Sequence, residues 1–264
     1  MRKMLEVEII KVDVPSGNTR RGMDFVAQEK PLYVFLDRSL YVTIFCTPSN
    51  LKELAVGHLL SEGIIRSIEE IKDVTLEGEG AVCRISLKDS IDLEKRLKLS
   101  KHTSRVIFSA CGSKGPYQPS LRLHRIKSDL KVKAATLSNS VNQLNSIGET
   151  FRKTGGVHVS AIFKSDGALV AFAEDVGRHN AVDKTIGIGA LSKLDFEQCF
   201  LALSGRLTGD IVTKAARLRM PVVGSLASAI DSGIAIAKNV DLTLVGFVRG
   251  KRMNIYSSPG RILM

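Results

Sequence analysis

The chain has 264 residues, 44% of them hydrophobic and 25% charged, and a formal net charge of +11 at pH 7. This composition is that of a soluble globular protein with one large or two modest domains. The high charge predicts an anionic ligand or partner. Nucleic acid is disfavoured, because Trp is absent, aromatic residues are few, and no RNP, KH or zinc-finger spacing occurs.

Neither the N-terminus nor any later segment predicts export or membrane insertion. Residues 1–8 carry charges where a signal peptide needs an apolar stretch. The most apolar late segment, 226–237, is interrupted by Asp231 and is too short to span a bilayer. We therefore expect a cytoplasmic protein with no membrane partner.

The first part of the chain, residues 1–115, is predicted to form an α+β subdomain. Residues 1–24 are polar and mixed in charge, and we expect them to be loosely ordered. The predicted elements that follow are strands at 32–36 and 40–46, a helix at 51–62 between Asn50 as cap and Gly63 as stop, and a hairpin at 71–76 and 81–87. The segment 104–120 is predicted to be a short strand that enters a loop, and this loop is expected to mark the boundary between the two units.

The second part, residues 116–264, alternates between helical and strand-like patterns. The predicted helices are 138–151, 180–190, 208–219 and 227–238, and the predicted strands are 157–163, 168–174, 199–203, 221–224, 242–248 and 253–256. This alternation predicts an α/β sandwich with a largely parallel sheet.

The stretch 155–184 contains the string Glu-Asp-Val-Gly-Arg-His-Asn-Ala-Val-Asp-Lys, which connects a predicted strand to a predicted helix. A polar loop at such a junction is a common place for a ligand site in an α/β sheet. The alternative is an ordinary helix cap by Asn180 with a solvated Arg178 and His179. From the residues alone, both interpretations remain open.

Of the four cysteines, Cys46, Cys83 and Cys199 lie within or beside apolar strand patterns and are interpreted as small core residues. No CxxC spacing occurs, so a zinc site is not expected. Cys111 differs, because it lies in a glycine-containing loop with Lys114 nearby, and a basic neighbour favours the reactive thiolate. The residues leave a structural and a reactive role for Cys111 equally open.

Two further segments are candidate anion sites. The first follows the strand 242–248 and comprises Phe247, Val248, Arg249, Gly250, Lys251 and Arg252. Its three cations could hold phosphate oxygens, and Phe247 or an arginine plane could stack on a purine. The alternative is a basic turn in solvent. The second segment, Ser204, Gly205 and Arg206, precedes a predicted helix whose N-terminus could bind a phosphate.

These strings, together with Asn254-Ile255-Tyr256 and Pro259-Gly260-Arg261-Ile262, closely resemble the formate dehydrogenase accessory sulfurtransferase family (FdhD) from about residue 25 to the C-terminus. The resemblance implies a cytidine-deaminase-like fold for the second part of the chain. The deaminase motifs His-x-Glu and Pro-Cys-x-x-Cys are absent, which disfavours zinc-dependent deamination.

The resemblance also implies a function. In the family a Cys-Gly-x-Cys-Gly motif carries a persulfide on its first cysteine, which corresponds to Cys111, whereas Lys114 replaces the second. Cys111 would accept sulfur from a cysteine desulfurase. It would then deliver this sulfur to the molybdenum of a bis-molybdopterin guanine dinucleotide cofactor for formate dehydrogenase.

The implied cofactor site lies near residues 247–252, and the implied oligomer is a homodimer. On this view Asp175, Arg178, His179 and Asn180 form a structural, cofactor-shaping cluster rather than acid–base catalysts. The alternative for His179 is a satisfied buried histidine, and His58, on a predicted helix, is interpreted in that way. The alternative function is a noncatalytic cofactor-binding chaperone that transfers no sulfur, because the second motif cysteine is missing.

Overall fold

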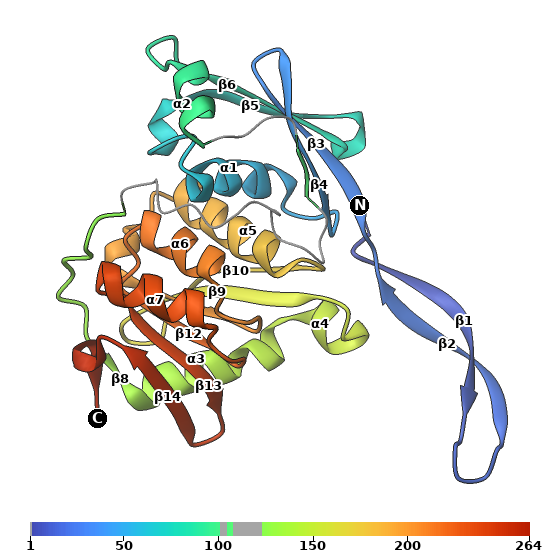
Figure 1. The fold of residues 1–264 in the computed structure, drawn as a ribbon. Helices are drawn as coiled ribbons and strands as arrows, with labels where there is room; N and C mark the ends of the chain where they lie inside the picture. Colours follow the sequence, from blue (N-terminus) through green and yellow to red (C-terminus); the bar gives the residue numbers. More distant parts are fainter. Residues whose placement is uncertain (1, 101–104, 108–122) are drawn as a thin grey trace.

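The computed structural model describes residues 2–100, 105–107 and 123–264, and they form two sheet-containing units and a projecting ribbon (Figure 1). The ribbon consists of β1 (Met4–Val12) and β2 (Thr19–Ala27), paired antiparallel. The expectation that residues 1–24 are loosely ordered is therefore wrong. Asp13 closes the turn, because its backbone pairs with Asn18 and Gly17 and lets the two strands meet in register.

The first unit is a mixed five-stranded sheet in the order β5-β6-β3-β4-β7. Its strands are β3 (Lys30–Leu36), β4 (Ser39–Cys46), β5 (Ile71–Glu77), β6 (Val82–Leu87) and β7 (Arg105–Ile107). Helix α1 (Leu51–Glu62) follows β4, and α2 (Leu93–Ser100) follows β6. The strands, hairpin and helix predicted here are confirmed. Gly63 ends α1 in the left-handed conformation as expected, but the side chain of Asn50 forms no capping hydrogen bond.

The second unit contains a six-stranded sheet in the order β10-β9-β11-β12-β13-β14. The strands are β9 (His158–Lys164), β10 (Leu169–Asp175), β11 (Cys199–Leu203), β12 (Val222–Ser225), β13 (Thr243–Arg249) and β14 (Arg252–Ser257). Only the pairs β11–β12 and β12–β13 are parallel, so the expectation of a largely parallel sheet is wrong. The short turns that join β9 to β10 and β13 to β14 force each pair to be antiparallel.

Helices cover both faces of this sheet, which confirms the α/β fold class. One face packs on α3 (Ala134–Ile147), which is followed by α4 (Glu149–Thr154). The other packs on α5 (Arg178–Leu191), α6 (Gly209–Arg217) and α7 (Asp231–Val240). Short 3-10 turns lie at Ile68–Glu70, Gly78–Gly80, Phe196–Gln198 and Pro259–Arg261. A small parallel pair, β8 (Val132–Lys133) with β15 (Ile262–Leu263), was not predicted.

Two predicted helices have different boundaries in the structure. The predicted helix 138–151 is interrupted at Gly148, because the Glu174 carboxylate accepts the backbone N–H groups of Thr150 and Phe151 and starts a new helix there. The predicted helix 227–238 begins only at Asp231, since Ala229 pairs with Leu207 and keeps the preceding residues extended.

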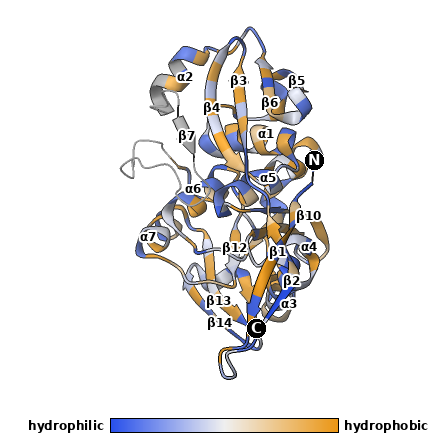
Figure 2. Ribbon diagram, turned by 90° about the vertical axis from the view of Figure 1, so that its right-hand side faces the viewer, coloured by the Kyte–Doolittle hydropathy of each residue, from blue (hydrophilic) through white to orange (hydrophobic). Residues whose placement is uncertain are grey.

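Helices α1 and α5 cross between the two sheets and join the units into one hydrophobic core (Figures 1 and 2). A Cβ on Gly57 of α1 would lie 1.8 Å from the carbonyl oxygen of Asp183 in α5. A Cβ on Gly187 of α5 would lie 1.9 Å from the carbonyl oxygen of Glu53 in α1. Only glycine at both positions permits this close approach of the two backbones. The proposed boundary at 115/116 lies outside the described residues.

Candidate functional site

The polar string at the start of α5 ties the two units together. Lys184 Nζ lies 2.6 Å from Asp175 Oδ2, and both side chains are fully buried. Asp175 also accepts the backbone N–H of Thr47 at 3.0 Å, while Lys184 donates to the Thr47 carbonyl at 2.8 Å. The amide of Asn180 donates to Asp175 and to the Phe45 carbonyl. Gly177 rather than Asn180 occupies the N-cap position of α5, so the interpretation of Asn180 as a helix cap is wrong.

A second buried network connects α1, α5 and α6. Lys214 Nζ lies 2.9 Å from Asp183 Oδ1 and 2.8 Å from Glu62 Oε1. Ser61 donates to Asp183 at 2.6 Å, and His58 Nδ1 lies 3.1 Å from the same carboxylate. Burial raises the pKa of Asp183, but the Lys214 charge and the hydrogen bonds outweigh it, so this pKa is lowered. His58 is buried as expected, although its Nε2 has no hydrogen-bond partner among the described residues.

His179 is buried close to this network and is held neutral. Its Nε2 has no hydrogen-bond partner in the described part of the chain and lies 3.9 Å from Asp210 Oδ2. Burial, with the nearby charges of Lys214 and Arg178, lowers the pKa of His179 to about 3. The imidazole is therefore uncharged at neutral pH and contributes no cation for binding an anion.

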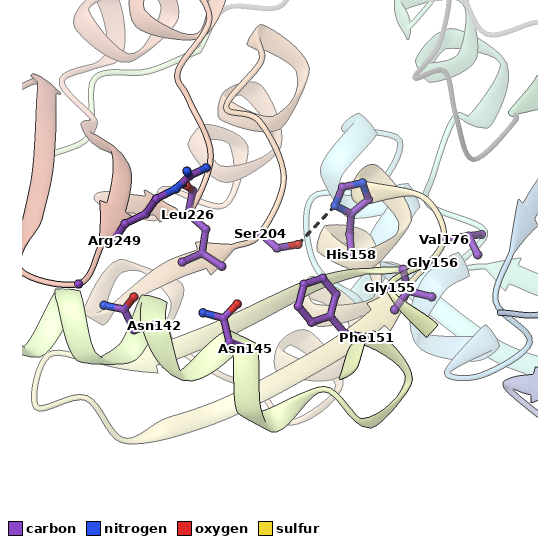
Figure 3. A pocket seen from close by; sticks show the side chains of 12 residues that line it. Asn142, Asn145, Phe151, Gly155, Gly156, His158, Val176, Ser204, Leu226 and Arg249 are labelled. Atoms are coloured by element: carbon purple, nitrogen blue, oxygen red, sulfur yellow. Dashed lines mark hydrogen bonds between the residues drawn. The ribbon is translucent and has the colours of Figure 1, made fainter. Parts of the chain in front are cut away.

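A pocket of about 610 Å³ lies at one end of the strands of the six-stranded sheet, next to α3 and α4. At this end β11, β12 and β13 finish and β9 begins. The pocket is lined by Asn142, Asn145, Phe151, Gly155, Gly156, Val157, His158, Val176, Ser204, Leu226, Arg249 and Gly250. Figure 3 shows the side chains of α3, α4 and the strand ends around one shared space. The carboxyl ends of parallel strands are a frequent ligand site.

Arg249 reaches this pocket because β13 is irregular. Phe247 has a φ of 51°, and the pairing of β13 with β14 shifts between Gly246 and Arg249. The Nε of Arg249 donates to the Leu226 carbonyl at 3.0 Å, which fixes the guanidinium at the pocket wall. Its two terminal amino groups form no hydrogen bond within the described residues, and they are thus available to an anion.

The opposite end of the pocket contains Ser204 and His158. Ser204 Oγ accepts the Val159 N–H at 3.0 Å and lies 3.3 Å from His158 Nδ1 (Figure 3). Burial lowers the pKa of His158, and the charges of Arg178 and Arg206 lower it further. A neutral imidazole can donate one hydrogen bond and accept another. This end of the pocket therefore offers a hydroxyl and an imidazole, with the charges of Arg178 and Arg206 nearby.

The structure brings the two predicted anion segments together only in part. Ser204, Arg249 and Gly250 line the pocket, although Ser204 is 45 or more residues from the other two in the sequence. The remaining predicted residues do not line it: Phe247, Val248, Lys251, Arg252, Gly205 and Arg206. Val248 is fully buried in the core, and Lys251 and Arg252 are exposed at the β13–β14 turn.

Sequence reasoning missed the α3 and α4 side of the pocket, which supplies Asn142, Asn145 and Phe151. These residues had no motif of their own, and only the helical pattern around them was recognised. His158 lies in the stretch 155–184, which was identified as informative, but no role was predicted for His158 itself. These residues form one site because α3 and α4 lie next to the ends of the strands.

Three of the four cysteines are confirmed as core residues. Cys46, Cys83 and Cys199 are each at most 2% exposed. Burial raises the pKa of Cys46 and of Cys83 to about 12 and that of Cys199 to about 11. These thiols stay protonated at neutral pH and are unreactive. Cys111, the predicted sulfur-carrying residue, and Lys114 lie outside the described residues.

Within ranges 2–100, 105–107 and 123–264, no group of three or more His, Cys, Asp or Glu side chains is arranged to hold a metal ion. In the same ranges, every helix is too short or too polar to cross a bilayer.

Known proteins resemble this chain along nearly its whole length. The profile of the FdhD/NarQ family matches residues 27–263. The sulfur carrier protein FdhD of Shouchella clausii is 34% identical over 252 residues, which cover 94% of this chain and 93% of that protein. The protein of the same name from Sulfolobus acidocaldarius is 33% identical over 261 residues, covering 98% and 99%.

A solved structure has the same fold. The crystal structure of a formate dehydrogenase accessory protein from Desulfotalea psychrophila superimposes with a TM-score of 0.79, covering 99% of this chain and all of that chain. Its sequence identity is 24%, so the likeness concerns the fold alone.

Proposed function

The chain belongs to the FdhD/NarQ family, and from this premise we propose that it is a sulfur carrier acting in formate dehydrogenase maturation. A cysteine desulfurase supplies the sulfur, Cys111 carries it as a persulfide, and the acceptor is the molybdenum of a bis-molybdopterin guanine dinucleotide cofactor. The protein acts in the cytoplasm as a homodimer. The cofactor is its cargo and not a resident prosthetic group.

The loading step is a thiol exchange. The Cys111 thiolate attacks the terminal sulfur of the desulfurase persulfide. The sulfur–sulfur bond of the donor breaks, a new one forms on Cys111, and the donor cysteine leaves as a thiolate. No net oxidation occurs and no general base is needed, so one exposed thiolate suffices. Lys114 in place of a second cysteine does not prevent this step.

The burial of the other cysteines is the observation that carries this assignment to Cys111. The chain has four cysteines, and Cys46, Cys83 and Cys199 have buried thiols with raised pKa values. A persulfide carrier needs a thiolate that a second protein can reach. Cys111 is the one remaining cysteine.

The pocket at the strand ends of the six-stranded sheet supports cofactor binding. Its size suits a nucleotide-sized ligand, since such sites span roughly 300–1,000 Å³. Arg249 would hold phosphate oxygens from one side, with Ser204 and His158 on the other. On the α3–α4 side, the Asn145 amide and the Phe151 ring offer the hydrogen bonding and stacking that a guanine base requires.

Mass spectrometry after incubation with a cysteine desulfurase and cysteine tests the proposed function. We expect a sulfur adduct on Cys111 of the wild type that is absent from Cys111→Ala. The matched control is Cys199→Ala, which removes a buried thiol and should leave the adduct in place. A wild-type protein without any adduct would exclude sulfur transfer and leave the noncatalytic cofactor-binding chaperone.

A further inference from the structure

The ribbon formed by β1 and β2 has few contacts with the rest of the chain in the part that the structure describes. It is a separate two-stranded sheet that projects away from both units (Figure 1). Contact with the body occurs at its base, where Lys153 of α4 lies 5.3 Å above the ring of Phe25 and Gly156 lies against Ala27. An isolated two-stranded hairpin is at best marginally stable in water, so a ribbon of this length needs a surface to pack on.

The ribbon also exposes apolar side chains along much of its length. Seven large hydrophobic residues of the ribbon and its turn are exposed, namely Leu5, Ile10, Val12, Val14, Met23, Phe25 and Val26. The pairing of β1 with β2 places Ile10, Val12, Met23 and Phe25 on one face, which also carries Glu6, Glu8 and Arg21. Ile10 is 68% exposed and Val12 58%. A row of this kind marks a protein-interaction surface.

The chain has a second unpartnered apolar surface at the free edge of the six-stranded sheet. Among the residues that the structure describes, β10 is the outermost strand on that side, and one row of its backbone groups has no neighbouring strand there. Leu169, Val170 and Phe172 of β10 are each 39% exposed. Proteins usually protect such an edge with charges or cover it, and this edge is apolar instead.

We propose that the ribbon of one copy packs on the exposed β10 edge of a second copy, and that the second copy reciprocates. One twofold axis then covers both surfaces at once, because each copy supplies one ribbon and one edge. The ribbon and its turn span residues 4–27, and the strands of nine residues reach about 30 Å. About half of the ribbon's residues lie on any one face, so the ribbon and β10 (Leu169–Asp175) of each copy together approach the roughly 20–30 residues a side of a stable interface.

The net charge of the protein predicts how dimerisation through this interface responds to salt. Each copy carries a formal charge of +11, so two copies repel one another at long range. Added salt screens that repulsion and leaves apolar contacts intact, so the dimer should become tighter between 50 and about 300 mM NaCl. An interface held by ion pairs would respond in the opposite direction. The inference names the contact surface of the homodimer in the proposed function and rests on that part of it.

Sedimentation of three variants of the full chain tests the proposal. The wild type should form a species of twice 28.7 kDa at micromolar concentration. Ile10→Glu and Phe172→Lys should each weaken dimerisation by at least about tenfold, because each places a charge in an apolar contact. Leu76→Glu changes a similarly exposed strand residue of the other sheet and is the matched control, which should still dimerise.

Mixing the two interface variants gives the sharpest result. A mixed pair retains one intact contact, between the ribbon of the Phe172→Lys copy and the edge of the Ile10→Glu copy, so mixing should restore dimers. A monomeric wild type, a dimer unaffected by Ile10→Glu, or a mixture that stays monomeric would overturn the inference. The Cys111 persulfide is measured on the same samples, so sulfur loading on a monomer would refute the interface and not the carrier function.

Discussion

Lys184 Nζ lies 2.6 Å from Oδ2 of Asp175, and neither side chain has any exposed surface. The pair also binds both backbone groups of Thr47, the residue that follows β4, so it joins the second unit to the first. Hydrogen bonds from Gly177 and Asn180 satisfy the second carboxylate oxygen. The most distinctive motif of the chain therefore fixes the relative position of the two units.

Replacement of Lys184 by Met should leave Asp175 buried without its cation. Removing one partner of a buried ion pair costs about 3–5 kcal/mol of unfolding free energy. Urea denaturation of Lys184→Met should show this loss, whereas Lys238→Met, at an exposed helix position, should change the free energy by less than about 0.5 kcal/mol. If Lys184→Met is as stable as Lys238→Met, the pair does not hold the units together.

The Gly57–Gly187 crossing makes a second stability prediction. An added methyl group at Gly57 would meet the Asp183 carbonyl oxygen, and a backbone atom cannot move aside as a flexible side chain can. Gly57→Ala should therefore cost about 1–3 kcal/mol or more in unfolding free energy. Gly260→Ala is the matched control, because no heavy atom lies within 4 Å of its Cβ position. Equal unfolding midpoints for the two variants would contradict the close crossing.

The sequence predicted most of the elements but not what brings the site together. The strand and helix patterns between 157 and 256 were found because local hydrophobic periodicity records them. The ribbon was missed, because residues 1–24 mix charges with apolar residues in a way that also describes a loose terminus. The prediction of a largely parallel sheet was wrong, because the alternation of strands and helices does not show which strands pair with each other.

The candidate site shows the same limit. Ser204 and Arg249 were identified from local cues, namely a polar loop after a strand and a basic turn. Val248 was included because it belongs to the same string, yet alternation along β13 turns its side chain into the core. Asn145 and Phe151 carry no local signal and acquire a place in the site only through the packing of α3 and α4 on the sheet.

His179 should make the protein less stable in mild acid. Its folded-state pKa of about 3 lies below the unfolded value of about 6.5, so only the unfolded chain takes up a proton between these values. Stability is thus complete above pH 6.5 and falls as the pH drops, by about 2 kcal/mol at pH 5. Urea unfolding at pH 7.5 and pH 5 should show a smaller acid-induced loss for His179→Gln than for the wild type.

The control for this pH effect is His124→Gln, which changes an exposed histidine and should retain the wild-type dependence. For each variant, the quantity compared is the change in unfolding free energy between pH 7.5 and pH 5, because either substitution could also shift the stability at pH 7.5. A wild-type acid-induced loss that persists unchanged in His179→Gln would assign the effect to other groups.

The pocket makes the prediction closest to function. Guanosine diphosphate is a fragment of the proposed cargo and should bind there. Arg249→Ala should weaken its binding by one to two decades, because a lost charge-assisted hydrogen bond costs about 1.5–3 kcal/mol. The affinity of the wild type should also fall with rising salt, since salt screens the ion pair between guanidinium and phosphate. Calorimetric titration at two salt concentrations measures both effects.

Arg252→Ala provides the matched control for this titration, because Arg252 is an exposed cation three residues away that does not line the pocket. It should bind guanosine diphosphate within about threefold of the wild type, since it loses only long-range attraction. Equal losses for Arg249→Ala and Arg252→Ala would show that the basic turn acts through its total charge, and the pocket would not be the phosphate site. The yield of persulfide on Cys111 should be the same in both variants, because sulfur loading requires the thiolate and not the nucleotide.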